Sequence, residues 1–119
     1  FNILGGGWEE GFDPASFAQE NRGETEVGAD VWIWTEAVIL HGITICAGAI
    51  VASRSVVSRD VHHYTIVSGN PARTVRTRFE DDVVARLLAL AWWDWPVEKI
   101  GRNLNAIRGA DIAALEAAA

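Results

Sequence analysis

Aliphatic side chains recur every six residues between Val27 and Val61. The positions in phase are Val27, Ile33, Ile39, Ile45, Val51 and Val57. Four places after each of them comes a second apolar or small residue, at Val31, Ala37, Ile43, Ala49, Ser55 and Val61. Neither the helical period of 3.6 nor the strand period of two describes this pattern as well. The spacing therefore predicts a repeated unit of short β-strands.

A fixed six-residue period of β-branched residues is typical of hexapeptide repeats, in which three short strands make one triangular coil and coils stack on a continuous core. Six hexads supply two coils of eighteen residues each, and hexads require left-handed coiling, an exception to the right-handed crossover rule. The predicted fold class is an all-β solenoid, a left-handed parallel β-helix with C-terminal α-helices packed on it. The alternative is an ordinary buried two-strand run in a mixed α/β domain.

The number of coils is small for this fold. Solenoid units cannot bury their apolar faces alone, and about three or more are needed for independent stability. We therefore expect upstream coils or neighbouring subunits to cover the top of the stack, because an uncovered strand edge invites association.

The segments outside the hexads divide the chain into three parts. Residues 1–26 are predicted as an irregular loop excursion, 27–68 as the coils, and 69–119 as a turn and C-terminal helices. Trp8 follows three glycines in the first part, and a tryptophan in such a loop is expected to act as a lid or a contact residue.

The third part begins with a turn at residues 69–71, after a last strand that contains Tyr64, Ile66 and Val67. Residues 79–93 predict a helix with an acidic first turn, and Pro96 ends it and starts a second short helix. Asp111 is the expected cap of a short final helix. We expect three tryptophans of this part to lie in the core, namely Trp92, Trp93 and Trp95.

Length and composition limit the remaining possibilities. The 119 residues make one domain, and the net charge of −6 argues against non-specific nucleic-acid binding and against an anionic membrane surface. No run of 18 uncharged apolar residues and no secretory signal is present, so a cytoplasmic location is expected. The single cysteine, Cys46, excludes an internal disulfide and a cysteine-rich metal site, and no metal is predicted.

The average charge hides a gradient along the chain. Residues 9–36 are strongly acidic, whereas residues 52–78 form a basic sector whose only acid is Asp60. The arginines of this sector are Arg54, Arg59, Arg73, Arg76 and Arg78. Because the planar guanidinium suits phosphate recognition, the sector is a candidate site for a polyanionic ligand. The alternative is a solvated charged face.

Three further stretches carry a resemblance to a known family: the hexads VGADVWIWTEAVILHGITICAGAIVASRSVVSRDV, the turn YTIVSGNPARTVRTRF and the helix LAWWDWPVEKI. Together with FNILGGGWEE they resemble the xenobiotic acetyltransferases of the hexapeptide-repeat superfamily, the group of streptogramin and chloramphenicol acetyltransferases. The resemblance implies a homotrimer that transfers acetyl from acetyl-coenzyme A to a hydroxyl of a small molecule in clefts between subunits. A histidine would remove the acceptor proton, with no acyl-enzyme.

The resemblance also implies roles for single residues. Trp32 matches a tryptophan at the pantetheine end of the cofactor cleft, and Thr35 and Ser53 match corners whose backbone groups bond the pantetheine amides. Near the nucleotide end and its phosphates, the matching residues are Ser58, Arg59, Arg73 and Arg76. Trp8 would belong to a loop on the substrate side.

The departures from the family leave the activity open. The family's catalytic histidine precedes the FNILGGGW segment, and none of His41, His62 and His63 matches it, so the catalytic residue is unknown. Trp34 and Cys46 stand where the repeats often place glycine, and Trp34 would project onto the surface where pantetheine should lie. The chain begins at Phe1 and contains no methionine, so a fragment or a processed chain is expected.

Two alternatives follow. The chain could be a non-catalytic, truncated hexapeptide-repeat protein that only assembles or binds, or a sugar or serine O-acetyltransferase of the same superfamily.

Overall fold

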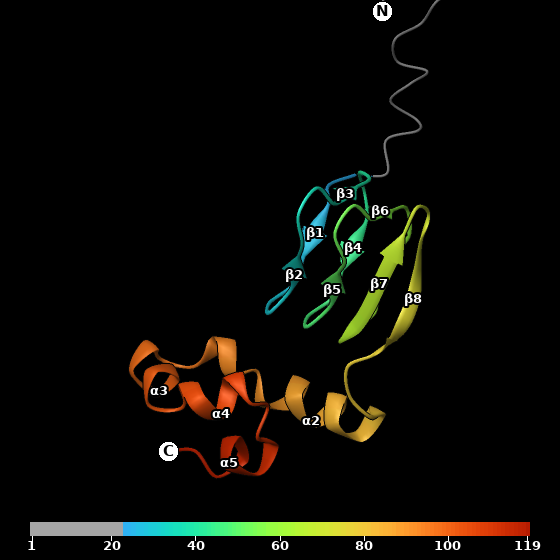
Figure 1. The fold of residues 1–119 in the computed structure, drawn as a ribbon. Coiled ribbons are helices and arrows are strands. Elements are labelled where there is room, and N and C mark those ends of the chain that lie inside the picture. Colours follow the sequence, from blue (N-terminus) through green and yellow to red (C-terminus); the bar gives the residue numbers. More distant parts are fainter. Residues whose placement is uncertain (1–22) are drawn as a thin grey trace, which may run out of the picture.

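The computed structural model describes residues 23–119, in which short strands form three small sheets and a group of helices follows them (Figure 1). The prediction for Trp8 and most of the predicted loop excursion lie outside these residues. The two-residue strands are β1 (Glu26–Val27), β2 (Trp32–Ile33), β3 (Val38–Ile39), β4 (Thr44–Ile45), β5 (Ile50–Val51) and β6 (Val56–Val57). The sheet orders are β1-β4, β3-β6 and β2-β5-β7-β8.

The strands pair in parallel across a constant step of 18 residues. Glu26 pairs with Thr44, Trp32 with Ile50, and Val38 with Val56, so each hexad lies over the hexad three repeats later. This parallel pairing at a constant step agrees with the repeated unit of short strands that the hexads predict. The last step is shorter, since Ile50 pairs with Ile66, only 16 residues on.

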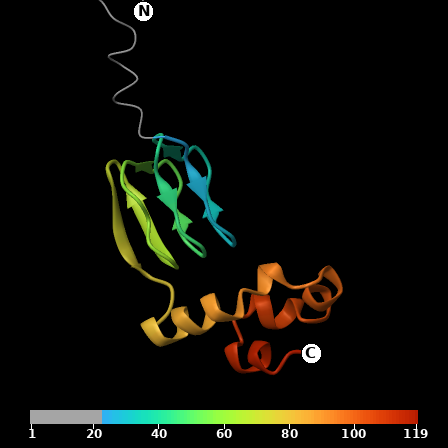
Figure 2. The same ribbon diagram turned by 180° about the vertical axis from the view of Figure 1, so that it is seen from behind.

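A β-hairpin ends the stack. β7 (Thr65–Gly69) pairs in parallel with β5 and antiparallel with β8 (Ala72–Thr77). Seen from behind in Figure 2, β8 lies at the outer edge of the strands. The strand β7 and the turn after it were predicted, but β8 was not. Four of its six residues are polar (Arg73, Thr74, Arg76 and Thr77), and a strand that borders only one neighbour needs no strong apolar pattern.

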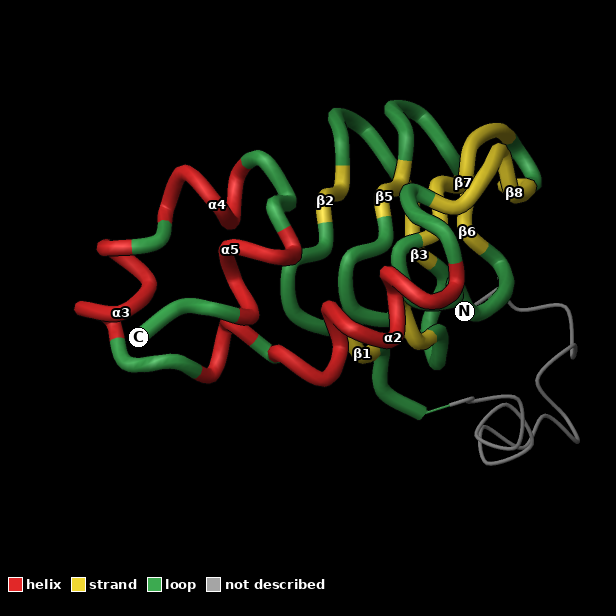
Figure 3. The backbone as a smooth tube through the Cα atoms, turned by 90° about the horizontal axis from the view of Figure 1, so that it is seen from below, coloured by secondary structure: helices red, strands yellow, loops and turns green. Residues whose placement is uncertain are grey.

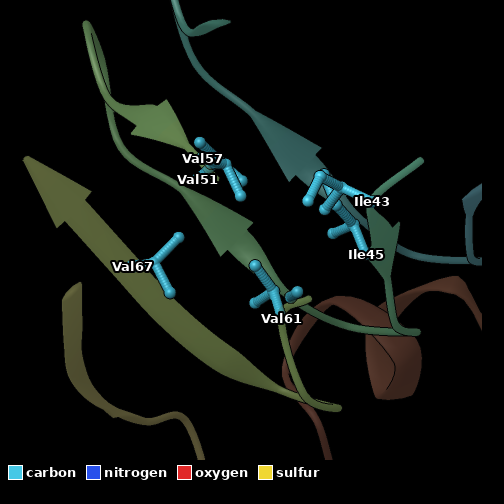
Figure 4. Close-up of a cluster of buried hydrophobic side chains, with 7 residues drawn as sticks. Ile43, Ile45, Val51, Val57, Val61 and Val67 are labelled. Carbon is cyan, nitrogen blue, oxygen red and sulfur yellow. The ribbon is translucent and has the colours of Figure 1, made fainter. Parts of the chain in front are cut away.

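Side chains that point into the coils make the first core (Figure 4). Its buried members are Ile43, Ile45, Ala49, Val51, Val57, Val61 and Val67. All except Val67 belong to the two predicted hexad positions, because β-branched residues at these positions point toward the coil axis. Val31, Ala37 and Ile39 of the first coil pack against this core and are only partly buried.

The helical part contains α2 (Asp81–Leu90), the 3₁₀ turn η1 (Trp92–Asp94), α3 (Val97–Arg102), α4 (Leu104–Arg108) and α5 (Ile112–Glu116). Pro96 precedes α3 as predicted, and the predicted cap is confirmed, since the Asp111 carboxylate accepts a hydrogen bond from the Ala114 amide at 3.1 Å. The helix predicted over residues 79–93 is shorter: it ends at Leu90, because Ala91 adopts a left-handed φ of 41° and a 3₁₀ turn follows before Pro96. The three tryptophans of this part are half-buried, and of the three only Trp95 packs against the second core.

A second core joins the helices to the coils. It is centred on Tyr64, Leu87 and Leu115, which are almost fully buried, so a corner of the last coil contacts both α2 and α5. Figure 3, seen from below, shows the helices running along one side of the stack and beyond β2. No helix in the described part of the chain is long and apolar enough to cross a membrane.

The corners of the coils have their own backbone signature. The second residue of each corner has a positive φ, at Asp30, Glu36, Gly42, Gly48, Arg54 and Tyr64. Glycine is required on steric grounds at Gly48, because a Cβ added there would lie 2.4 Å from the ring of Tyr64. At four other corners a non-glycine residue carries the strain of this conformation, namely Asp30, Glu36, Arg54 and Tyr64.

Candidate cofactor face

The outer face of the sheet β2-β5-β7-β8 carries the largest group of the predicted site residues. Val51 and Val67 are buried and therefore point inward. Since side chains alternate along a strand and paired residues share a face, the neighbours of these valines point outward. We call the outward residues of the four strands, together with Trp34 and Ala52, the Trp–Arg face. Trp34 and Ala52 directly follow β2 and β5, and their amides donate to the carbonyls of Val51 and Val67, which continues the register. The residues of the face are Trp32, Trp34, Ile50, Ala52, Ile66, Ser68, Arg73 and Arg76.

Strand register arranges these residues in two files that run across the coils. In the first file Trp32 lies beside Ile50, Ile50 beside Ile66, and Ile66 beside Arg76. The second file consists of Trp34, Ala52, Ser68 and Arg73, where Ser68 pairs with Arg73. Each file thus begins with a tryptophan on the first described coil and ends with an arginine on the hairpin. Trp32, Arg73 and Arg76, which are far apart in the sequence, share one face.

The two tryptophans are strongly exposed. Trp32 is 65% and Trp34 51% solvent-accessible, and their rings meet edge to face with centroids 5.8 Å apart. The tryptophan edge-to-face contact holds both rings beside the corner that begins at Thr35. The expectation that Trp34 projects onto the cofactor surface agrees with this geometry.

Thr35 and Ser53 lie one coil apart at that corner, as expected from their 18-residue spacing. The Arg54 amide donates a hydrogen bond to the Thr35 carbonyl at 2.9 Å. Outside the corner, the guanidinium of Arg54 pairs with the carboxylate of Glu36 at 3.0 Å, and both side chains are more than 60% exposed. Both hydroxyl residues are exposed.

Two of the predicted arginines border one pocket. Its volume is about 130 Å³, and its lining contains Arg59, Arg73, Asp60 and Thr74 above the side chains of Val57, Val61, Val67 and Ala72. Within residues 23–119 neither Arg59 nor Arg73 forms an ion pair. Asp60 is already engaged, because its Oδ1 accepts a hydrogen bond from the Thr44 amide at 2.8 Å. The pocket therefore offers two available guanidinium groups at the end of the stack.

Arg76 does not line this pocket, and its Nη1 donates to the Thr77 carbonyl at 3.2 Å. Ser58 follows β6 and is half-buried. The histidines His41, His62 and His63 lie outside the strands of the Trp–Arg face. Cys46 is half-buried before a corner, and burial, together with the charge of Asp60, raises the pKa of its thiol. Among residues 23–119 there is no cluster of three or more His, Cys, Asp or Glu residues suited to a metal ion.

Arg78 is a structural residue that sequence reasoning placed only in the basic sector. Its guanidinium donates to the Gly48 carbonyl at 2.9 Å, lies 3.8 Å from the Asp30 carboxylate, and stacks over Tyr64 with 5.4 Å to the ring centroid. It therefore touches the equivalent corners of three successive coils. The signal available in the sequence was the 18-residue spacing of Asp30 and Gly48, which marks the same corner.

The pKa shifts around Arg78 are those of a partly buried site. Burial raises the pKa of Tyr64 to about 12, the charge of Asp30 adds to the shift, and Arg78 opposes it. Burial also raises the pKa of Asp30, against the lowering effect of Arg78. The hydroxyl of Tyr64 is buried and has no hydrogen-bond partner within the described residues.

Comparison with known proteins relates the sequence of this chain to a family of bacterial transferases. The family model described as bacterial transferase hexapeptide (six repeats) matches residues 24–59. A chloramphenicol acetyltransferase of Escherichia coli is 44% identical over 107 residues, which cover 90% of this chain and 51% of that protein. A chloramphenicol acetyltransferase of Agrobacterium fabrum is 43% identical over 104 residues, 87% of this chain and 50% of that protein.

Two further relatives extend the comparison. A probable macrolide acetyltransferase of Lysinibacillus sphaericus is 42% identical and covers 88% of this chain and 58% of that protein. A hexapeptide-repeat acetyltransferase of Vibrio cholerae, solved in complex with acetyl coenzyme A, is 41% identical, with a TM-score of 0.48 over 49% of this chain and 32% of that chain.

Residues 24–59 therefore carry the repeats of the bacterial hexapeptide transferases. Within them, the resemblance to the xenobiotic acetyltransferases is confirmed, since relatives are named for chloramphenicol, macrolides and virginiamycin A. The chain spans about half the length of the curated chloramphenicol acetyltransferases it matches.

Proposed function

We propose that this chain is the acetyl-coenzyme A-binding, C-terminal part of an O-acetyltransferase that acts on a hydroxyl group of an antibiotic-like small molecule. The observation that carries the proposal is the Trp–Arg face, whose Arg73 also borders the pocket that Arg59 lines at the end of the stack. Relatives named as acetyltransferases of chloramphenicol, of macrolides and of virginiamycin A support the reaction class.

The residues present fit an acyl-coenzyme A molecule. Its nucleotide end carries several phosphate charges, and two unpaired guanidinium groups beside an apolar floor suit such a group. Its pantetheine arm is long, thin and mostly uncharged, as is the strip of residues between the arginines and the tryptophans. Trp32 would wall that arm at the far end, and the corner of Thr35 and Ser53 would bond its amides.

The cofactor supplies an acetyl group activated as a thioester. In the transfer the acceptor oxygen forms a bond to the acetyl carbon, the carbon–sulfur bond breaks, and the acceptor proton passes through a base to the leaving thiolate. Holding both reactants side by side supplies a large part of the rate. No residue of this chain is assigned as the base, because His41, His62 and His63 lie away from the Trp–Arg face.

The same proposal extends to fold and assembly. We propose that the coils form a left-handed parallel β-helix and that three chains associate around it in the cytoplasm. The exposed apolar side chains of the first coil support association. Light scattering of the purified protein should give the mass of a trimer, and a monomeric mass at micromolar concentration would refute this part.

Binding of coenzyme A tests the central proposal. Titration calorimetry with acetyl-coenzyme A should give binding to the chain, and Arg59→Ala and Arg73→Ala should each weaken it by about 10- to 100-fold, as expected for charge-assisted hydrogen bonds. Arg108→Ala, which removes the same charge from α4, is the matched control and should bind as the unaltered chain does. Equal affinities for all four proteins, or no binding at all, would contradict the proposal.

A second candidate function follows from the position of the histidines. Since none of the described histidines lies on the strands of the Trp–Arg face, the chain could bind the cofactor, or only assemble, without transferring acetyl. Release of free thiol from acetyl-coenzyme A in the presence of chloramphenicol, a macrolide, a sugar or serine separates these cases. Acceptor-dependent release would exclude the non-catalytic candidate, and the preferred acceptor would decide between antibiotic and sugar or serine acetylation.

A further inference from the structure

The two files of the Trp–Arg face differ in side-chain size. In the first file Trp32 is followed by the large side chains of Ile50 and Ile66. In the second file Trp34 is followed by Ala52 and Ser68, the smallest outward side chains of the face. Trp34 therefore stands at the head of a low strip of small residues.

The low strip has a defined direction. Arg73, at its other end, borders the arginine pocket. It belongs to β8, which is three strand positions from β2 in the order β2-β5-β7-β8 (Figure 1). With a spacing of about 4.8 Å between neighbouring strands, this distance is about 14 Å. A ligand with an anionic head and an apolar tail would place its head at Arg73, and its tail would extend along Ala52 toward Trp34.

Trp34 is held in place at this end. Its ring contacts that of Trp32 edge to face, with 83° between the ring planes. A ring with such a contact on one side and a strand below it changes its rotamer less readily, when a ligand presses on it, than an isolated exposed side chain does. Trp34 thus closes the apolar end of the strip.

We propose that Trp34 limits the length of the acyl group on the donor, so that acetyl is accepted and longer acyl chains are disfavoured. This inference rests on the proposed function, since it assigns the donor's head to Arg73 and its acyl end to Trp34. A pocket wall discriminates each additional methylene by roughly 10- to 200-fold when it cannot yield. Because Trp34 lies at an open surface, where the added methylenes of a longer chain can turn away from the ring into solvent, we expect about 10-fold in total for a long acyl chain and not 10-fold for each methylene.

The test compares donors of different acyl length. Titration calorimetry of the chain with acetyl-, butyryl- and octanoyl-coenzyme A should show octanoyl-coenzyme A binding about 10-fold more weakly than acetyl-coenzyme A. Trp34→Ala should reduce this ratio to about twofold or less. Trp34→Tyr, which keeps a large ring, should retain most of the discrimination and guards against loss of folding in the alanine variant.

Val38→Ala is the matched control, because Val38 is a similarly exposed apolar residue of the first coil that lies on a different sheet. It should retain the 10-fold ratio. Equal binding of the three donors to the unaltered chain, or an unchanged ratio in Trp34→Ala, would overturn the inference and leave the proposed function intact. Failure of every coenzyme A derivative to bind would overturn both.

Discussion

Equivalent hexad positions in the first and second coils have the same residue types and different surroundings. Val27 and Ile33 of the first coil are 52% and 42% exposed, whereas Ile45 and Val51, which pair with them, are fully buried. The second coil lies between the first coil and the segment that contains Val61 and β7, whereas the first coil has a neighbour on only one side within the described structure. The repeat pattern thus sets the direction of a side chain, while its burial depends on the next coil.

The same contrast holds at the corners. The corner of Asp30, Gly48 and Tyr64 lies under the helices and is joined by Arg78. The corner of Glu36 and Arg54 faces solvent. Corners with the same backbone geometry therefore differ in role. On one side of the stack the corner supports the helices, and on another side it forms a solvent-accessible surface.

The largest expected effect is on the core of the second coil. Ile45→Ala should lower the free energy of unfolding by about 2–5 kcal/mol, because it leaves a cavity between two coils. Ile33→Ala, at the equivalent position of the first coil, should cost about 1 kcal/mol or less, since its side chain is already partly solvated. Urea unfolding of both variants measures the difference. Similar losses would show that the first coil is covered in solution, for example by another subunit.

The buried corner provides the next test. Gly48→Ala should destabilise the chain by about 2 kcal/mol or more, because alanine disfavours the positive φ and its Cβ meets the ring of Tyr64. Gly101→Ala is the control, since it lies in α3 with no atom close to an added Cβ; it should gain about 0.5–1 kcal/mol. Equal effects in thermal unfolding would mean that the corner is not packed as described.

Tyr64→Phe should change stability at neutral pH by about 1 kcal/mol or less, because the lost hydroxyl has no partner. Its effect should depend on alkaline pH. The folded pKa of about 12 exceeds the ordinary value of 10, so the folded state keeps the proton that the unfolded state releases. This stabilisation is complete below pH 10 and is lost as pH rises toward 12. Unfolding midpoints from pH 9 to 12 should fall more steeply for the unaltered chain than for Tyr64→Phe, and parallel curves would contradict the assignment.

The smallest effect is expected at the exposed corner. Glu36→Gln removes the ion pair with Arg54, and it should change stability by about 0.5 kcal/mol or less, since both side chains are well solvated. The difference should shrink further at high salt. A loss above about 1 kcal/mol would show that this corner is buried in an assembly and would remove the contrast between the two corners.

Much of the fold was predictable because the hexads encode it locally. The period placed β1 to β6, the inward residues and the corners, and the signals at Pro96 and Asp111 placed α3 and α5. The N-cap at Asp111 could be predicted because a capping side chain bonds to its own helix within three residues. The antiparallel strand β8 was missed because its residues pair with β7 through a turn and border solvent, which leaves little apolar signal in Ala72–Thr77.

The candidate site was predictable in composition but not in arrangement. The charges along the sequence indicated one arginine-rich sector. Only the structure shows that Arg73 lies at the end of the file that begins with Trp34, and that Arg59 and Arg73 line the same pocket. The separate position of Arg76 depends on an irregularity of register between Ile66 and Val67. Such a shift of register has no sequence signature of its own.

The sequence distance between paired strands falls from 18 to 16 residues at the last pairing. Additional coils can therefore be inserted at one end of the stack but not at the other. A duplicated 18-residue unit inserted within residues 26–43 would keep every partner in register and every αL corner in place. The same unit inserted after β6 would separate the hairpin from the two short-step pairings, Ile45 with Val61 and Ile50 with Ile66, on which it is seated. Repeat number can therefore vary during evolution on the tryptophan side, while the arginine end remains constant.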